Sequence, residues 1–237
     1  MNRSGMLSGL VLLLQIVWVL PSFAGMEDDP LLFAYFIDEF EWRDADDGDL
    51  TSWDLQGWIG KDLKKFWWKI EGESINGNIK GTEIQLLYSR AVAPYWNVNF
   101  GFRTDIKPDT GNDWAVLGIQ GLAPYFFELD AALFFSDSGQ IAARLEAGYE
   151  FMFSQKLILS PEIEINAYSK TDAVNGLGSG LSNFEFGLRL RYEFRREFAP
   201  YIGLIWDRKF GTSADLSRLD GKPATDTQLV IGVRAWY

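Results

Sequence analysis

The chain has 237 residues, with 33 acidic and 22 basic side chains and a formal net charge of −11. This acidic balance argues against nucleic acid as a partner. The sequence contains neither cysteine nor histidine, which excludes disulfides, thiolate metal sites and the commonest general base.

The first 24 residues have the features of a secretory signal peptide. Arg3 supplies a positive charge, residues 5–20 form an apolar run, and residues 22–24 end in a small-x-small pattern. We expect cleavage after Ala24. An uncleaved membrane anchor is the alternative, although the run is short for a spanning helix. Residues 25–32 then form a short N-terminal segment.

Alternating apolar and polar residues, divided by clusters of Gly, Pro, Asn and Asp, predict twelve strands in the remainder. In residues 181–194, for example, Phe184, Phe186 and Leu188 alternate with Glu185 and Arg189. An apolar outside and a charged inside are typical of transmembrane barrels, which need an even number of strands in bacteria. We therefore predict an all-β fold, a transmembrane antiparallel up-and-down β-barrel over residues 33–237. The predicted strands span residues 33–43, 50–60, 64–74, 79–90, 95–105, 113–122, 125–135, 140–152, 157–168, 181–194, 198–210 and 225–237.

One residue breaks the alternation in the first predicted strand. Asp38 shares the parity of Phe36, Phe40 and Trp42. This indicates either a β-bulge at that point or a wrong assignment of the two faces.

The lengths of the connections predict which end of the barrel faces the periplasm. Short turns at the periplasmic end are expected at residues 60–63, 89–94, 121–124, 154–156 and 195–199. Longer outer loops are expected at residues 106–112, 169–180 and 211–223, among others. Ala-Pro-Tyr recurs at residues 93–95, 123–125 and 199–201, where proline suits a tight turn and tyrosine suits the aromatic belt at the membrane interface.

The last strand, TQLVIGVRAWY, is amphipathic to its end. It must pair with the first strand to close the cylinder, because an open edge in lipid leaves backbone groups unsatisfied.

The polar parity of the strands predicts a lumen lined by many carboxylates and fewer cations. These charges either form ion pairs that brace the wall or draw cations into the lumen. The pairs Glu71–Glu73 and Glu162–Glu164 each place two carboxylates on one face, a spacing that suits a shared cation. With no histidine and no distinct pair of catalytic acids, we expect no enzymatic activity. Beyond the metal candidates given below, the expected lumen-lining residues are Arg43, Glu83, Glu128, Asp130, Arg144, Glu146, Glu162, Glu164, Glu185, Arg189 and Arg191.

Residues 36–73, FIDEFEWRDADDGDLTSWDLQGWIGKDLKKFWWKIEGE, resemble the copper resistance protein B family. The similarity continues through EIQLLYSRAVAPYW, WAVLGIQGLAPYFFELDAALFFSDSGQIAARLEAGYE, GLGSGLSNFEFGLRLRYEFRREFAPYIG and DTQLVIGVRAWY. The resemblance implies a protein of the outer membrane of a Gram-negative bacterium. It would bind copper ions or pass them across that membrane, beside a periplasmic multicopper oxidase.

Many members of this family carry a long Met- and His-rich leader, whose soft ligands suit copper. Here only a few residues from Gly25 precede the first predicted strand, so the role of such a leader is not carried over. Carboxylates are poor ligands for Cu(I) and acceptable ones for Cu(II). The residues expected to meet copper are Glu39, Glu41, Glu71, Glu73 and Met26.

Two alternatives differ from this interpretation. One is a small cation-permissive or structural outer-membrane barrel without copper specificity. The other is a soluble, lipocalin-like binding barrel in the periplasm. We expect a monomer surrounded by outer-membrane lipid.

Overall fold

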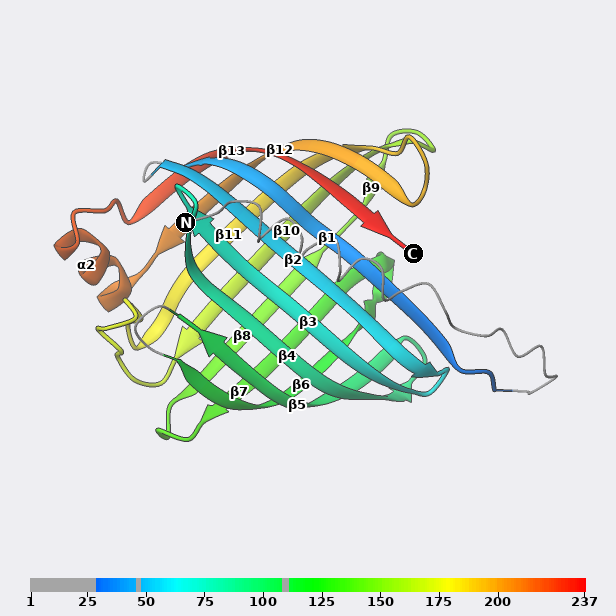
Figure 1. Ribbon diagram of the computed structural model, residues 1–237, viewed down its shortest axis with the longest axis horizontal. Helices are drawn as coiled ribbons and strands as arrows, with labels where there is room; N and C mark the ends of the chain where they lie inside the picture. Colours follow the sequence, from blue (N-terminus) through cyan, green and yellow to red (C-terminus); the bar gives the residue numbers. More distant parts are fainter. Residues whose placement is uncertain (1–28, 46–47, 108–110) are drawn as a thin grey trace, which may run out of the picture. The chain divides into compact units, whose positions relative to one another are not determined.

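The computed structural model describes residues 29–45, 48–107 and 111–237. Its larger compact unit, Leu31–Tyr237, is an antiparallel β-barrel (Figure 1). The predicted signal peptide and Met26 lie outside the described residues. No helix among the described residues is long and apolar enough to cross a membrane.

The barrel wall follows the order of the chain. Each strand that spans the wall pairs with the next along the chain, with β8 paired to β10, and β13 pairs with β1 to close the circle. The strands are β1 (Leu32–Ala45), β2 (Gly48–Lys61), β3 (Lys64–Ile75), β4 (Asn78–Ala93), β5 (Trp96–Ile106), β6 (Asn112–Ala123), β7 (Phe127–Ser136), β8 (Ile141–Gly148), β9 (Phe151–Met152), β10 (Leu157–Tyr168), β11 (Gly180–Tyr192), β12 (Phe198–Lys209) and β13 (Thr225–Trp236).

The short strand β9 continues β8 and does not add a position to the wall. Both pair with β10 in one register, with Gly148 opposite Glu162 and Phe151 opposite Leu159. The interruption lies opposite Pro161, which has no N–H to donate to the ladder; its carbonyl still accepts from the Tyr149 N–H at 3.1 Å. The barrel therefore has twelve spanning positions, which confirms the predicted fold.

The last strand closes the barrel as predicted. β13 pairs with β1 along its length, from Trp236 opposite Phe36 to Leu229 opposite Asp44. Tyr237 extends the pairing by exchanging backbone hydrogen bonds of 2.9 and 3.0 Å with Tyr35, and the two rings stack with centroids 5.4 Å apart. The barrel has no unpaired edge at this seam.

A β-bulge at Asp38 explains its irregular parity. The pairing of β1 shifts by one residue against both neighbours, between Ile37 and Glu39 on β2 and between Ile37 and Phe40 on β13. Outward-facing residues are therefore odd-numbered before the bulge and even-numbered after it. Asp38 itself lines the lumen.

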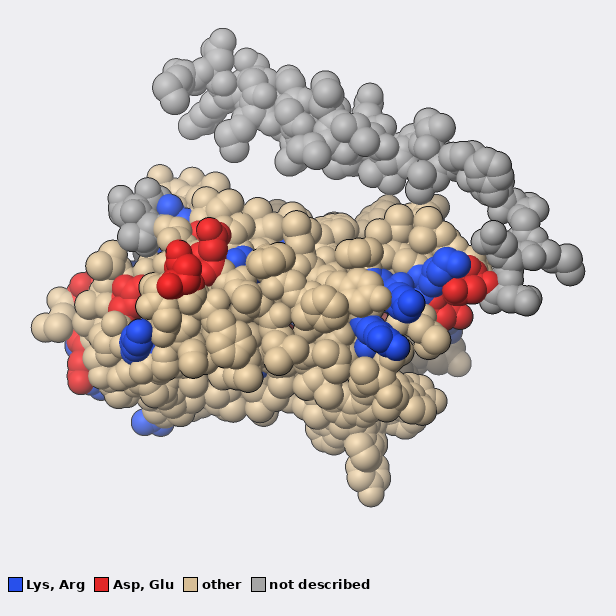
Figure 2. Space-filling model, turned by 90° about the horizontal axis from the view of Figure 1, so that it is seen from below, with Lys and Arg blue, Asp and Glu red and all other residues tan. Residues whose placement is uncertain are grey.

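The outer face of the barrel is apolar. Large hydrophobic side chains such as Phe40, Phe100, Phe102 and Leu117 are exposed on it. Figure 2 shows the result on one face, a broad band without charge and acidic and basic side chains gathered toward the two ends. Such a band suits contact with the hydrocarbon of a membrane.

The connections differ between the two ends of the barrel. At the end that holds Tyr237, no connection is longer than residues 193–197. At the other end, the connections include residues 169–179 and 210–224. By the rule for bacterial barrels, the short-turn end is periplasmic.

The second long connection contains a helix that the sequence analysis did not predict. α2 (Gly211–Leu219) lies within the expected loop at residues 211–223. Its Ser213 Oγ accepts a 2.7 Å hydrogen bond from the Gly178 N–H and lies 2.8 Å from Ser182 Oγ. The first contact fastens the two long connections to each other, and the second fastens α2 to the start of β11.

The prediction for the third Ala-Pro-Tyr motif is wrong. Tyr95 and Tyr125 occupy turns with φ of 66° and 68° and are exposed, but Tyr201 lies inside β12 and is only 5% exposed. The chain turns earlier here, where Arg195 and Phe198 exchange backbone hydrogen bonds. Tyr201 therefore points into the lumen and not toward the membrane interface.

The orientation of the wall leads to a stability prediction. Replacing Leu117, exposed at the middle of β6, by arginine should lower the free energy of unfolding by about 2–4 kcal/mol, because a cation at the bilayer midplane is costly. The exposed Leu63 in a short turn offers a matched control, for which Leu63→Arg should cost about 0–1 kcal/mol. Urea unfolding in lipid vesicles measures both, and equal costs would contradict this membrane placement.

Candidate functional site: a carboxylate-lined lumen

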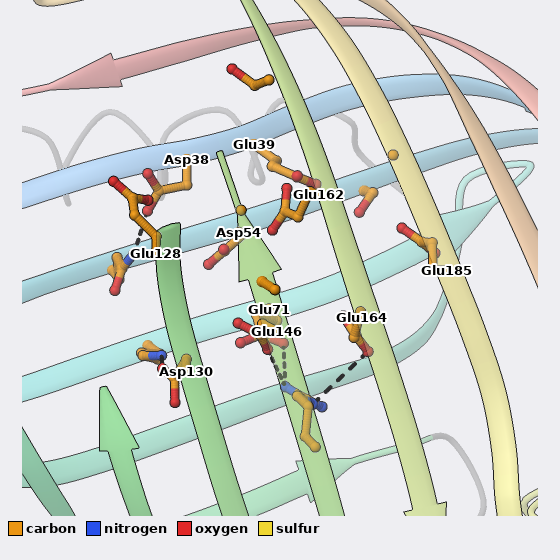
Figure 3. A pocket seen from close by; sticks show the side chains of 18 of the residues that line it. Asp38, Glu39, Asp54, Glu71, Glu128, Asp130, Glu146, Glu162, Glu164 and Glu185 are labelled. Atoms are coloured by element: carbon orange, nitrogen blue, oxygen red, sulfur yellow. Dashed lines mark hydrogen bonds and ion pairs between the residues drawn. The ribbon is translucent and has the colours of Figure 1, made fainter. Parts of the chain in front are cut away.

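The lumen contains a cavity of about 790 Å³. Figure 3 shows ten of its carboxylates projecting from strands on different sides of the barrel. The lining includes fourteen acidic and eight basic residues, an excess of six negative charges. The acidic residues are Asp38, Glu39, Asp54, Glu71, Glu73, Glu83, Asp105, Glu128, Asp130, Glu146, Glu150, Glu162, Glu164 and Glu185. The basic residues are Arg43, Lys69, Arg103, Lys107, Arg144, Arg189, Arg191 and Arg234.

Most of these carboxylates lie in two rows that follow the register of the sheet. In the first carboxylate row, each residue is directly opposite the next on the neighbouring strand, across β1 to β5: Glu39, Asp54, Glu71, Glu83 and Asp105. The second carboxylate row runs in the same way from β7 to β13: Asp130, Glu146, Glu164, Glu185, Asp207 and Asp226. Like charges directly opposite each other on adjacent strands repel. The rows therefore require cations close by.

Arg189 supplies one such cation. Its guanidinium contacts Glu39 at 2.5 Å, Glu41 at 2.6 Å and Glu162 at 3.0 Å. Glu41 is 1% exposed and also accepts hydrogen bonds from Arg43 Nε at 2.7 Å and from the Tyr201 hydroxyl at 2.9 Å. This buried carboxylate is fully satisfied by its neighbours, as the burial of a charge requires.

Two glycines make room for this group. A Cβ at Gly187 would lie 2.6 Å from the guanidinium of Arg189, and a Cβ at Gly232 would lie 2.6 Å from the ring of Tyr201. Small residues at these lumen positions let the longer side chains lie flat against the wall. The sequence around the site is therefore fitted to Arg189 and Tyr201.

Arg144 links the two carboxylate rows across the lumen. It contacts Glu71 at 3.0 Å and Glu83 at 2.9 Å in the first row, and Glu146 at 3.8 Å and Glu164 at 4.0 Å in the second. Arg43 makes a similar link, since it contacts Glu39 at 3.3 Å in the first row and Glu185 at 3.7 Å in the second. These arginines neutralise carboxylates of both rows.

One wall of the lumen is apolar. Leu87, Trp114, Val116, Phe134 and Ala142 form a buried cluster inside the barrel. The guanidinium groups of Arg103 and Arg144 lie over the ring of Phe134, 4.7 and 5.6 Å from its centroid. Because this cluster occupies one side, the polar cavity runs along the rest of the lumen.

Three of the lining carboxylates make no ion pair within the described part of the chain: Asp54, Glu73 and Glu128. Asp54 lies directly between Glu39 and Glu71 in the first row. No basic side chain of the described residues lies within ion-pair distance of these groups, which leaves them accessible to mobile cations.

The glutamates predicted to meet copper contact different partners in the lumen. Glu39 and Glu41 converge on Arg189, and Glu71 turns to Arg144, whereas Glu73 lines the cavity without an ion pair. Glu162 and Glu164 also reach different arginines. Neither Glu71 and Glu73 nor Glu162 and Glu164 therefore share one arginine, whereas Glu39 and Glu41 do. Among the described residues, no group of three or more acidic side chains is arranged to hold a metal ion.

The other predicted lumen residues all line the cavity. Lys69 binds Asp130 at 2.9 Å, and Arg191 binds Glu150 at 2.7 Å. Three further lining residues were not predicted from the sequence: Asp54, Asp105 and Tyr201. Asp54 alternates with Ser52 and Gln56 on the polar face of its strand, so it could have been predicted as a lumen residue. Tyr201 could not, because its Ala-Pro-Tyr motif resembled a turn.

Solved structures with a similar fold define the class of protein. The NanC porin, in a rhombohedral crystal form, aligns with a TM-score of 0.56 and 13% identity, covering 86% of this chain and 99% of the other. Together with the apolar outer face and the polar lumen, this likeness makes the chain an outer-membrane β-barrel.

Residues 31–237 match the family described as copper resistance protein B precursor (CopB). The chain is 45% identical over 210 residues to the copper resistance protein B homolog of Pseudomonas syringae pv. tomato, covering 88% of this chain and 71% of that protein. It is 40% identical over 212 residues to copper resistance protein B of Escherichia coli, covering 90% and 72%. The chain belongs to the copper resistance protein B family, as its sequence resemblance predicted.

The burial of Glu41 leads to a second stability prediction. Arg189→Gln should lower the free energy of unfolding by up to about 3–5 kcal/mol, because it removes one of the two guanidinium groups that hold the buried carboxylate of Glu41. The exposed ion pair of Arg218 with Asp215, at 2.9 Å, provides the control: Arg218→Gln should cost less than about 1 kcal/mol. Urea unfolding in detergent micelles measures the difference. Similar costs for both variants would show that the Arg189 contacts do not stabilise the barrel.

Proposed function

We propose that this protein binds copper ions in its lumen and passes them across the outer membrane. The observation that carries the proposal is the pair of carboxylate rows, which place an acidic side chain on most strands at matching register. Membership of the copper resistance protein B family supports copper as the cation.

The chemistry of the donors favours weak, sequential contacts. Oxygen ligands suit Cu(II) better than Cu(I), and the carboxylates are spread along the wall instead of forming a chelate among the described residues. Conduction needs sites that attract an ion and also release it. Unpaired groups such as Asp54 and Glu128 are suited to that role, since no guanidinium lies within ion-pair distance of them.

A second candidate is a general cation-permissive or structural barrel without copper specificity. The observation in its favour is that arginines and lysines already pair with most of the lumen carboxylates, including Glu71 and Glu83 through Arg144. Such ion pairs brace a wall whether or not ions pass.

We further propose a host, a processing step and a partner for this protein. The outer-membrane fold supports a Gram-negative host and removal of residues 1–24 as a signal peptide. The family resemblance supports a periplasmic multicopper oxidase as a partner at the short-turn end. The family and the porin-like fold support a monomeric barrel without enzymatic activity, embedded in outer-membrane lipid.

Growth of a deletion strain tests copper specificity. Loss of the gene should lower tolerance to copper while tolerance to zinc and nickel stays unchanged, because the proposal assigns the lumen to copper. Growth is measured across a concentration series of each metal, with the gene restored on a plasmid as the control. Equal copper tolerance with and without the gene would overturn the copper assignment and favour the second candidate.

The unpaired carboxylates allow a test that leaves the ion-pair network intact. Asp54→Asn combined with Glu128→Gln should lower the ratio of cation to anion permeability roughly sixteenfold, because each unit charge acting over about 10 Å of water favours a cation and disfavours an anion by roughly 0.4 kcal/mol. Reversal potentials in planar bilayers under a salt gradient measure this ratio.

The matched control removes two acidic charges from the outer connections, at Asp137 and Asp215, both outside the cavity lining. Asp137→Asn combined with Asp215→Asn should leave the ratio near that of the unaltered protein. If the lumen variant keeps the same ratio as this control, Asp54 and Glu128 do not select the ions that pass.

A further inference from the structure

Two basic side chains face each other on the outer wall at the short-turn end. Lys64 on β3 is directly opposite Arg90 on β4, and Lys61 on β2 is opposite Lys64. Lys64 and Arg90 are exposed and share the outward parity of Phe66 and Leu86. Cations from neighbouring strands therefore lie side by side on the face that meets the membrane.

This arrangement is unfavourable without an anion. Like charges directly opposite each other on adjacent strands destabilise a sheet. Within the described residues, neither Lys64 nor Arg90 makes an ion pair, and Asp62 in the adjoining turn pairs with neither. An external anion between the two side chains would remove the repulsion.

The surroundings place this pair at the depth of lipid headgroups. On the side toward the middle of the barrel, Phe66, Tyr88 and Phe100 form a continuous aromatic row, with centroids 5.3 and 5.0 Å apart. On the side toward the turns, Val92 and Tyr95 are also exposed. Aromatic rows of this kind mark the interface between hydrocarbon and water, so the cations lie where lipid phosphates lie.

The position along the barrel indicates the leaflet. Lys64 and Arg90 belong to the end with short turns, which faces the periplasm. Figure 2 shows a group of basic side chains at the right-hand end of the apolar band, the end where the β2–β3 turn lies in Figure 1. The phosphates available at this depth belong to phospholipids of the periplasmic leaflet.

We propose that Lys64 and Arg90 form a binding site for the phosphate of an anionic phospholipid, whose acyl chain packs along Phe66, Tyr88 and Phe100. The surroundings favour a lipid over an acidic protein as the ligand, because apolar side chains border the cations on both sides. A soluble protein would have to enter the membrane interface to reach them.

Native mass spectrometry of the full barrel in micelles tests the site. With phosphatidylglycerol added to a phosphatidylcholine background, the unaltered protein should retain phosphatidylglycerol. Lys64→Gln combined with Arg90→Gln should weaken this retention roughly 25-fold, because each basic side chain at a lipid surface contributes a factor of about five. The variant Lys64→Arg combined with Arg90→Lys should retain the lipid, since it keeps both charges.

The control removes two exposed cations from other turns at the same end, through Lys156→Gln combined with Arg195→Gln. It should retain nearly as much phosphatidylglycerol as the unaltered protein. Heat-dependent mobility in gels verifies that each variant is folded, and the charge-conserving variant serves as the comparison if the Gln variant is not. Equal retention by the Gln variant and the unaltered protein would overturn the proposal. Binding of polyglutamate, but not phosphatidylglycerol, through Lys64 and Arg90 would also overturn it and assign the surface to an acidic protein.

Discussion

The lumen depends on arginine side chains that reach across it to carboxylates of opposite walls. The register of the sheet sets acidic residues directly opposite one another on neighbouring strands, an arrangement that repels itself. Arg144 contacts acidic residues from both carboxylate rows. Since several carboxylates are buried, the wall can hold them only with these partners in place.

The same ion pairs shape what the lumen can do. A guanidinium bound to several carboxylates is a fixed cation, and a mobile cation must either pass beside it or take over its ligands. The lining has an excess of acidic residues, and Asp54 and Glu128 make no ion pair among the described residues. A mobile cation can therefore pass beside the arginines without displacing them. Structural bracing and ion passage are therefore compatible in one lumen, because different carboxylates serve each purpose.

Much of the fold could be predicted from alternation alone, because the side-chain period of two assigns each residue to one face of a strand. This was enough for the twelve spanning positions, and parity also assigned residues such as Arg144 and Glu185 to the inner face. The carboxylate rows could not be predicted, since they depend on the register between strands and not on any single strand. The two glutamates at 71 and 73 looked like one site in the sequence, yet Arg144 takes only the first. Tyr201 and α2 were missed because a Pro-Tyr pair and a run of small polar residues both resemble turns.

The bulge at Asp38 has a consequence for how this strand can change during evolution. Residues 33 and 35 reach the membrane on odd numbers, and residues 40 and 42 reach it on even ones, only because one extra residue lies between them. Loss of one residue at the bulge would restore plain alternation and leave Phe40 and Trp42 facing lipid and Glu39 and Glu41 facing the lumen. A second deletion would have no extra residue to absorb it, and it would turn the aromatic side chains toward water and the glutamates toward lipid. The bulge therefore gives the first strand room for a change of one residue in length and no more.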